Sequence, residues 1–130
     1  MVGLDTNVLA RYILRDDPAQ YEAAASVIET LTTDAPGFVT HVALAELVWL
    51  LRTAYGMPRQ DRLAVVRALV RTDAFEFEDG ESVVRALAAS EEGADFADAL
   101  IAASGEMFGA AETVTFDRAA AARLGWRLLG

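Results

Sequence analysis

The sequence predicts an α/β protein in which a short parallel sheet is covered by helices on both faces. Five short apolar or alternating segments occur along the 130 residues, and segments with helical spacing separate them. The chain is 54% hydrophobic. A chain of this length buries about two-thirds of the surface that its unfolded state exposes. We therefore expect residues 1–130 to form one domain with its own core.

The expected strands are short and are bounded by turn or cap residues. The first apolar run stops at Asp5, and Ala35-Pro36-Gly37 forms a turn before the second strand. Residues 74–78 alternate between apolar and polar side chains, as a strand does. The strands are expected at residues 2–4, 38–40, 74–78, 113–115 and 126–128.

The expected helices lie between these strands and carry recognisable start and stop signals. Asp17-Pro18 is an N-cap followed by proline at the first helical position, and Asp79 is a second N-cap. Gly56 stands where a helix is expected to end. The helices are expected at residues 6–14, 18–31, 41–55, 58–70, 80–92, 95–108 and 117–124. Trp49, Trp126 and the phenylalanines are expected in the core.

Composition excludes several classes of protein. The chain has no cysteine, which excludes disulfide scaffolds, zinc ribbons, iron–sulfur sites and thiol nucleophiles. All eleven basic residues are arginine, which excludes a Walker A loop and a lysine Schiff base or general base. His41 is the only histidine, so a histidine-rich metal site is impossible.

Charge and hydropathy suggest where and how the protein acts. The longest apolar stretch, residues 42–51, is interrupted by Glu46 and is too short to span a membrane. The N-terminal segment has no basic leader, so we expect a cytoplasmic protein. The net charge of −9 should repel nucleic acid, which disfavours a plain DNA- or RNA-binding module. It does not disfavour an enzyme that gathers carboxylates around a divalent metal ion.

Two acidic residues directly follow expected strands. Asp5 follows the first strand and Asp117 follows the fourth. Ligands of parallel α/β sheets bind outside the carboxyl ends of the strands, so both residues are expected at the functional edge. An alternative is that each residue simply caps the helix that follows it, because aspartate is strongly preferred at that position.

Two further acidic residues lie among apolar residues of expected helices. The helical neighbours of Glu46 include Val42 and Trp49, so its carboxylate is expected to face an apolar surface. Asp98 lies in a similar run, three residues after Asp95, and this pair also resembles a capping box. If the acids at the strand ends and in the helices converge, their repulsion requires a cation. Mg²⁺ and Mn²⁺ use such oxygen ligands.

The chain resembles the PIN-domain nucleases, and in particular the VapC-type toxins of toxin–antitoxin modules. The matching segments are Leu4-Asp5-Thr6-Asn7, Ala45-Glu46-Leu47, the run from Asp95 to Ala103, and Thr115-Phe116-Asp117. Their order and spacing, and the total length of the chain, agree with that family. The resemblance therefore covers the whole chain.

This resemblance implies a fold and a site. The fold is an α/β/α sandwich whose central, mostly parallel sheet has about five strands. The site is a Mg²⁺ or Mn²⁺ centre in which Asp5 and Asp98 bind the ion directly, while Glu46 and Asp117 bind it directly or through water. The supporting residues would be Asn7, Asp95 and Thr115.

The resemblance also implies a reaction and partners. The reaction is hydrolysis of an RNA phosphodiester that leaves a 5′-phosphate, and the partners are a VapB-type antitoxin and a second copy of the toxin. Two alternatives stay open: a PIN-domain nuclease outside a toxin–antitoxin pair, and a non-catalytic module that binds a partner. The sequence does not identify the RNA. It also leaves open whether Arg11 and Arg15, which share a helical face, are solvated or contact phosphate.

Overall fold

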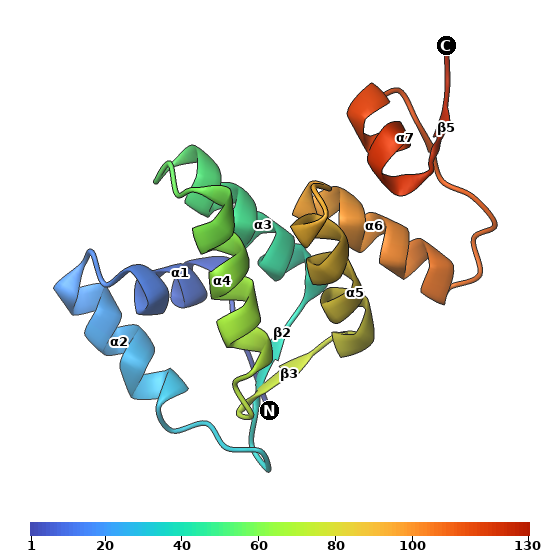
Figure 1. Ribbon diagram of the computed structural model, residues 1–130. Helices are drawn as coiled ribbons and strands as arrows, with labels where there is room; N and C mark the ends of the chain where they lie inside the picture. Colours follow the sequence, from blue (N-terminus) through green and yellow to red (C-terminus); the bar gives the residue numbers. More distant parts are fainter. The chain divides into compact units, whose positions relative to one another are not determined.

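The computed structural model describes residues 1–130, and Figure 1 shows the elements in chain order. The chain forms two compact units, residues 1–78 and residues 79–130. Each unit has its own parallel strands and its own helices.

A parallel sheet of three strands lies at the centre of the first unit. The strands are β1 (Val2–Gly3), β2 (Gly37–Val39) and β3 (Phe75–Phe77), in the order β1-β2-β3. Gly37 is the Cα partner of Val2 on one side and of Phe75 on the other. Because β1 pairs only with β2, it forms an edge of this sheet.

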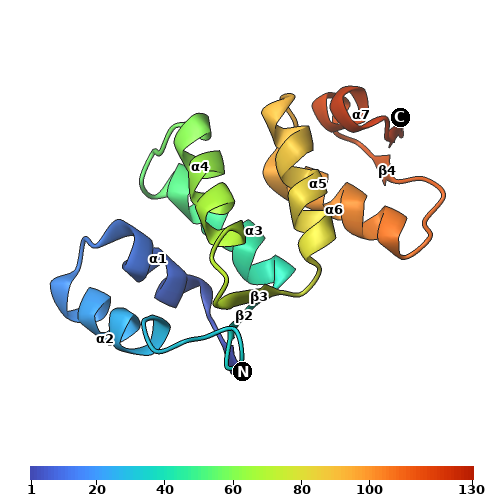
Figure 2. The ribbon, with the colours of Figure 1, turned by 60° about the horizontal axis from the view of Figure 1, so that its bottom comes forward.

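Four helices complete the first unit: α1 (Thr6–Leu14), α2 (Pro18–Ile28), α3 (His41–Thr53) and α4 (Arg59–Val70). In Figures 1 and 2, α1 lies beside α2 and α3 lies beside α4. Apolar side chains from the strands and helices meet in a common core. Its fully buried members are Leu9, Val39, Leu44, Leu47, Leu51 and Val66.

The second unit is built on a helical pair. The helices α5 (Gly80–Glu91) and α6 (Phe96–Met107) pack side by side in both views. After them come β4 (Val114–Thr115), α7 (Arg118–Leu124) and β5 (Arg127–Leu128), and β4 pairs with β5 in parallel. Apolar side chains of α5 and α6 form the core of this unit.

Local hydrogen bonds explain where several helices begin and end. The Thr40 hydroxyl accepts a bond from the Ala43 amide at 3.0 Å, which starts α3. Gly93 lies in the turn between α5 and α6 with a φ of +114°, a conformation that favours glycine. A Cβ at Gly93 would lie 2.2 Å from Nη1 of Arg123, so a side chain here would also displace the end of the Arg123 side chain.

The expected α/β class is confirmed, and the details differ in three ways. The five strands are each two or three residues long, and they form a ladder of three and a ladder of two. Helix α2 ends at Ile28 rather than Leu31, because the amides of Thr30 and Leu31 bond to Val27 and Ile28 in tighter turns. Helix α3 ends at Thr53, two residues before the expected position. None of the helices combines the length and the apolar character that crossing a membrane requires.

Candidate active site

Asp5 lies at the start of α1, immediately after β1. It occupies the N-cap position, but its carboxylate forms no cap hydrogen bond. Its backbone carbonyl instead accepts the Val8 amide at 3.0 Å. The capping alternative is therefore not realised here. The exposed Asp5 carboxylate keeps its oxygens available for a ligand.

The residues after Asp5 fix α1 to the rest of the first unit and line a groove. Thr6 is buried, and its hydroxyl donates to the Ala43 carbonyl of α3 at 3.3 Å. Asn7 is exposed and lines a groove of about 420 Å³ between β1, α1 and α2. The other lining residues are mostly apolar and include Val2, Val8 and Val27.

Glu46 lies on the outer face of α3, which corrects the expectation that it faces a buried apolar surface. Its side chain is exposed. Two of its helical neighbours are apolar but also exposed, Val42 by 77% and Trp49 by 62%. The buried side of α3 is formed by leucines at other helical positions. Trp49 therefore does not belong to the core, contrary to expectation, because it shares the outer face with Glu46.

Asp95 and Asp98 lie at the start of α6. The Asp95 carboxylate accepts a hydrogen bond from the Asp98 amide at 3.1 Å, so its capping role is confirmed. Partial burial, followed by the charges of Asp95 and Asp117, raises the pKa of the Asp98 carboxyl above its ordinary value. The charges of Asp95 and Asp117 are therefore close enough to act on Asp98.

Asp117 follows β4, as expected, and begins α7. Its carboxylate accepts a hydrogen bond from the Ala120 amide at 3.0 Å, so Asp117 also caps its helix. Its own amide donates to the Thr115 hydroxyl at 3.0 Å. Thr115 thus fixes the backbone that carries Asp117. A cap bond uses only some of the lone pairs of a carboxylate, so capping and metal binding are compatible.

The candidate acids are therefore distributed between the units, with Asp5 and Glu46 in the first and Asp98 and Asp117 in the second. Neither unit contains a ready-made group of three or more Asp, Glu, His or Cys side chains that could hold a metal ion. The donors are all carboxylates, which fit hard divalent ions such as Mg²⁺ and Mn²⁺. A cation near Asp98 would also oppose the burial and the neighbouring charges that raise the pKa of this residue.

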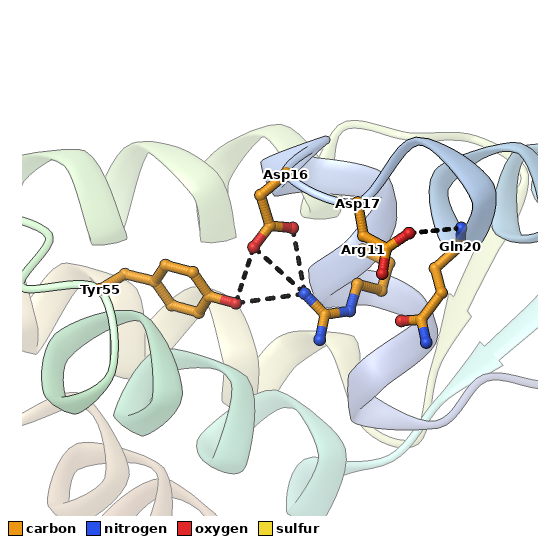
Figure 3. Close-up of polar contacts among 5 residues, drawn as sticks. All are labelled: Arg11, Asp16, Asp17, Gln20 and Tyr55. Carbon is orange, nitrogen blue, oxygen red and sulfur yellow. Dashed lines mark hydrogen bonds and ion pairs between the residues drawn. The ribbon is translucent and has the colours of Figure 1, made fainter.

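Two arginines of the first unit, Arg11 and Arg15, contact other side chains of the same unit. Nη1 of Arg11 donates to both carboxylate oxygens of Asp16 at 3.1 Å, and the Tyr55 hydroxyl joins the same network (Figure 3). The guanidinium of Arg15 lies over the Tyr21 ring, 4.8 Å from its centre. Both arginines thus have partners within the protein.

Two residues that sequence reasoning left out stand beside Asp117. Phe116 is 80% exposed, although the phenylalanines were expected in the core. It lies in the bend between β4 and α7, where the side chain has no helix or strand to pack against. Arg118 is exposed and has no hydrogen-bond or ion-pair partner. The signal in the sequence was an aromatic residue and an arginine on either side of a candidate catalytic acid.

One of three comparisons with known proteins gave a match. Neither the curated proteins nor the solved structures yielded a match. A family model for the PIN domain matches residues 2–126, which include both units and all four candidate acids. The chain therefore belongs to the PIN domain family, whose members are generally nucleases.

Proposed function

We propose that this protein is a divalent-metal-dependent endoribonuclease that acts as the toxin of a toxin–antitoxin pair. The observation that carries the catalytic part is the environment of Asp98, which is partly buried and lies near the charges of Asp95 and Asp117 in a chain of the PIN family. Carboxylates that repel one another are costly unless a cation binds them. Mg²⁺ or Mn²⁺ is the cofactor proposed here, because the available donors are carboxylate oxygens.

In this proposal each residue has a defined role. Asp5, Glu46, Asp98 and Asp117 hold the ion, with Asp5 and Asp98 as direct ligands. The supporting residues are Asn7, Asp95 and Thr115, of which Asp95 fixes the start of α6 and Thr115 fixes the backbone of Asp117. When bound, a divalent ion polarises a phosphoryl oxygen and lowers the pKa of a bound water.

Metal binding can be tested without knowing the RNA. We expect Mn²⁺ to raise the Tm of the wild-type protein, because a site filled at 100 times its Kd stabilises the fold by about 2.7 kcal/mol. The Asp98→Asn variant should show a much smaller Mn²⁺ response. Asp73→Asn is the matched control, since Asp73 is exposed and lies outside the proposed site. A wild-type Tm that does not respond to Mn²⁺ would contradict the proposal.

The reaction itself predicts a particular product. Hydrolysis through an attacking water should leave a 5′-phosphate on the downstream RNA fragment, as the resemblance to the VapC-type toxins implies. The test is to incubate purified protein and Mn²⁺ with total RNA and to identify the new 5′ ends by ligation that requires a 5′-phosphate. Fragments with 5′-hydroxyl ends would refute hydrolysis of this kind.

The toxin role predicts two protein partners, a VapB-type antitoxin and a second copy of this chain. The apolar groove between β1, α1 and α2 and the exposed Val42 and Trp49 of α3 are surfaces that such partners could cover. Expression of the chain alone should arrest bacterial growth, whereas Asp98→Asn should not. Light scattering should give the mass of a dimer. Growth without arrest and without RNA cleavage would instead favour a non-catalytic binding module.

A further inference from the structure

An exposed aromatic ring and an unpaired cation lie on either side of Asp117. Phe116 is 80% exposed, and Arg118 extends from the first residue of α7 into solvent. Asp117 is close enough to Asp98 to raise the pKa of that residue. Phe116 and Arg118 are therefore the chain neighbours of an acid that lies near Asp98.

Arg118 differs from every other arginine of this unit. Arg85 pairs with Glu106, and Arg127 forms a double hydrogen bond with Glu112. Nη1 of Arg123 donates to the Glu92 carbonyl at 3.2 Å. Arg118 alone has all of its donors free. In a chain with a net charge of −9, an unpaired guanidinium beside an aspartate is available to an anion.

Phe116 differs from the buried phenylalanines in a similar way. Phe75 and Phe96 pack in the cores of their units, whereas the ring of Phe116 faces solvent. An exposed planar ring matches an unstacked nucleobase, and single-stranded RNA is recognised largely by such stacking. Along an RNA strand, bases and phosphates alternate. An aromatic ring next to a cationic group matches one such repeat, with Phe116 for the base and Arg118 for the phosphate.

We propose that Phe116 stacks on a base of single-stranded RNA while Arg118 binds an adjacent phosphate, so that the two residues position the strand beside Asp117. This proposal rests on the proposed nuclease function, because it assumes that RNA is the substrate. It assigns substrate binding to two residues that the metal site does not use. It also accounts for RNA binding by an acidic protein, because the attraction is local.

The test measures RNA binding separately from cleavage. All variants are made in full-length protein carrying Asp98→Asn, which removes one repelling charge and prevents cleavage. The probe is a fluorescein-labelled, mixed-sequence single-stranded RNA of about 12 nucleotides, within the range that single-strand-binding modules contact. Fluorescence anisotropy gives the Kd in the presence of Mn²⁺ at several salt concentrations.

The substitutions separate stacking from simple apolar contact. Phe116→Leu keeps the apolar character without the aromatic face, and should raise the Kd by about fivefold or more. Phe116→Trp should keep wild-type affinity, and its new indole fluorescence should be quenched by the RNA. Arg118→Gln should reduce the slope of log K against log salt by about 0.7, the loss of one phosphate contact on a single strand.

Matched controls exist within the chain. Phe108 is 90% exposed in the same unit but has no candidate acid beside it, so Phe108→Leu should leave the Kd unchanged. Arg71 is an exposed arginine without a partner in the first unit, and Arg71→Gln should leave the salt slope unchanged. Because Phe116 is exposed, Phe116→Leu should also leave the Tm unchanged.

Each contrary outcome has a distinct meaning. If the parent protein binds RNA and Phe116→Leu binds it equally well, the stacking proposal is wrong while the nuclease proposal stands. If Phe116→Leu leaves RNA binding unchanged but converts a dimer to a monomer, Phe116 contacts another protein molecule and the stacking proposal is also wrong. A parent protein that binds no RNA would overturn the stacking proposal, and a wild-type protein that also cleaves no RNA in the presence of Mn²⁺ would overturn the nuclease proposal as well.

Discussion

The two units of this chain hold their candidate acids in different ways. In the first unit, Asp5 and Glu46 are exposed, and neither carboxylate accepts a hydrogen bond from the protein. In the second unit, Asp95 and Asp117 accept backbone amides, and Asp98 is partly buried near both of them. The first unit thus leaves its carboxylates unconstrained, whereas the second holds Asp95 and Asp117 in place by capping, with their charges near Asp98.

The cores of the units differ as well. The most deeply buried side chains of the first unit are aliphatic, and they join β2 to α1, α3 and α4. The most deeply buried residues of the second unit include Ser82 and Ser90 together with Val83. Since apolar burial is the main stabilising term in folding, the first unit should depend more strongly on its core. The second unit should respond more strongly to charge and to helix capping.

The largest expected effect is on the core of the first unit. Leu47 is fully buried in α3, so Leu47→Ala should lower the free energy of unfolding by about 2–5 kcal/mol through lost burial and a cavity. Urea denaturation followed by circular dichroism measures this change. The substitution also tests whether the units unfold together, as we expect of one domain matched by a single family model.

Each unit contains one of the two tryptophans, which provides a local probe. In a Trp49→Phe background, the fluorescence of Trp126 reports only on the second unit. If residues 1–130 form a single cooperative domain, Leu47→Ala should shift the Trp126 transition as far as it shifts the circular dichroism transition. A Trp126 transition that does not move would show that the units unfold independently.

The next largest effect is on the stability of variants at Asp117 and Asp5, and it separates the contribution of helix capping from that of charge. The Asp117 carboxylate caps α7, and asparagine also caps helices whereas alanine does not. In metal-free protein, Asp117→Ala should therefore be about 0.5–2 kcal/mol less stable than Asp117→Asn. At Asp5, which forms no cap bond, the alanine and asparagine variants should have the same stability. Thermal unfolding of the four variants measures both differences, and a gap at Asp5 of similar size would show that its carboxylate caps α1 in solution.

Much of this fold follows from local signals in the sequence. Asp17 and Asp79 were predicted to cap helices, and each of their carboxylates accepts the expected amide. For Asp117, capping was the alternative to a role in the site, and its carboxylate also accepts the cap amide. Such caps involve residues three positions apart, so a local pattern is sufficient to find them. The division of the strands into two ladders could not be predicted in this way, because strand pairing joins residues that are distant in the sequence.

The sequence indicated which residue types form the candidate site, but not whether their side chains are buried or exposed. Acids at strand ends and among apolar helical residues indicated a metal site from the sequence. Those acids, Asp5, Glu46, Asp98 and Asp117, are the metal-binding residues of the proposed function. The exposure of Glu46, Trp49 and Phe116 was not predictable. Periodicity identifies which residues share a face of a helix, but the packing of other elements decides whether that face is buried.

A smaller effect tests the crowding in the second unit through pH. Burial and the charges of Asp95 and Asp117 raise the pKa of Asp98, so the folded state binds this proton more tightly than the unfolded state. The Asp98 carboxyl therefore stabilises the fold at a pH below the ordinary aspartate pKa of about 3.9. This contribution is lost as the pH rises through the raised pKa of Asp98 in the folded protein. Asp98→Asn should therefore raise the Tm of metal-free protein at neutral pH, and the difference should shrink in acid. As a control, Glu46→Gln in the first unit should not raise the Tm. A Tm of Asp98→Asn below that of the wild type at neutral pH would contradict the prediction, because it would show that the charge of Asp98 stabilises the fold.

The smallest expected effect is a decrease in Tm when the charge of Glu112 is removed, which is opposite in sign to the effect expected at Asp98. Nε and Nη2 of Arg127 donate to Glu112, and this hydrogen bonding followed by the charge of Arg127 lowers the pKa of Glu112. A lowered pKa means that the carboxylate stabilises the fold above its unfolded pKa, and that this contribution is lost as the pH falls through the folded value. Glu112→Gln should therefore lower the Tm slightly at neutral pH, and not in acid or at high salt, because the pair is exposed. Within one unit, removal of a charge should thus stabilise the protein at position 98 and destabilise it at position 112. Equal shifts of the same sign would mean that net charge, rather than local crowding around Asp98, governs the stability of the second unit.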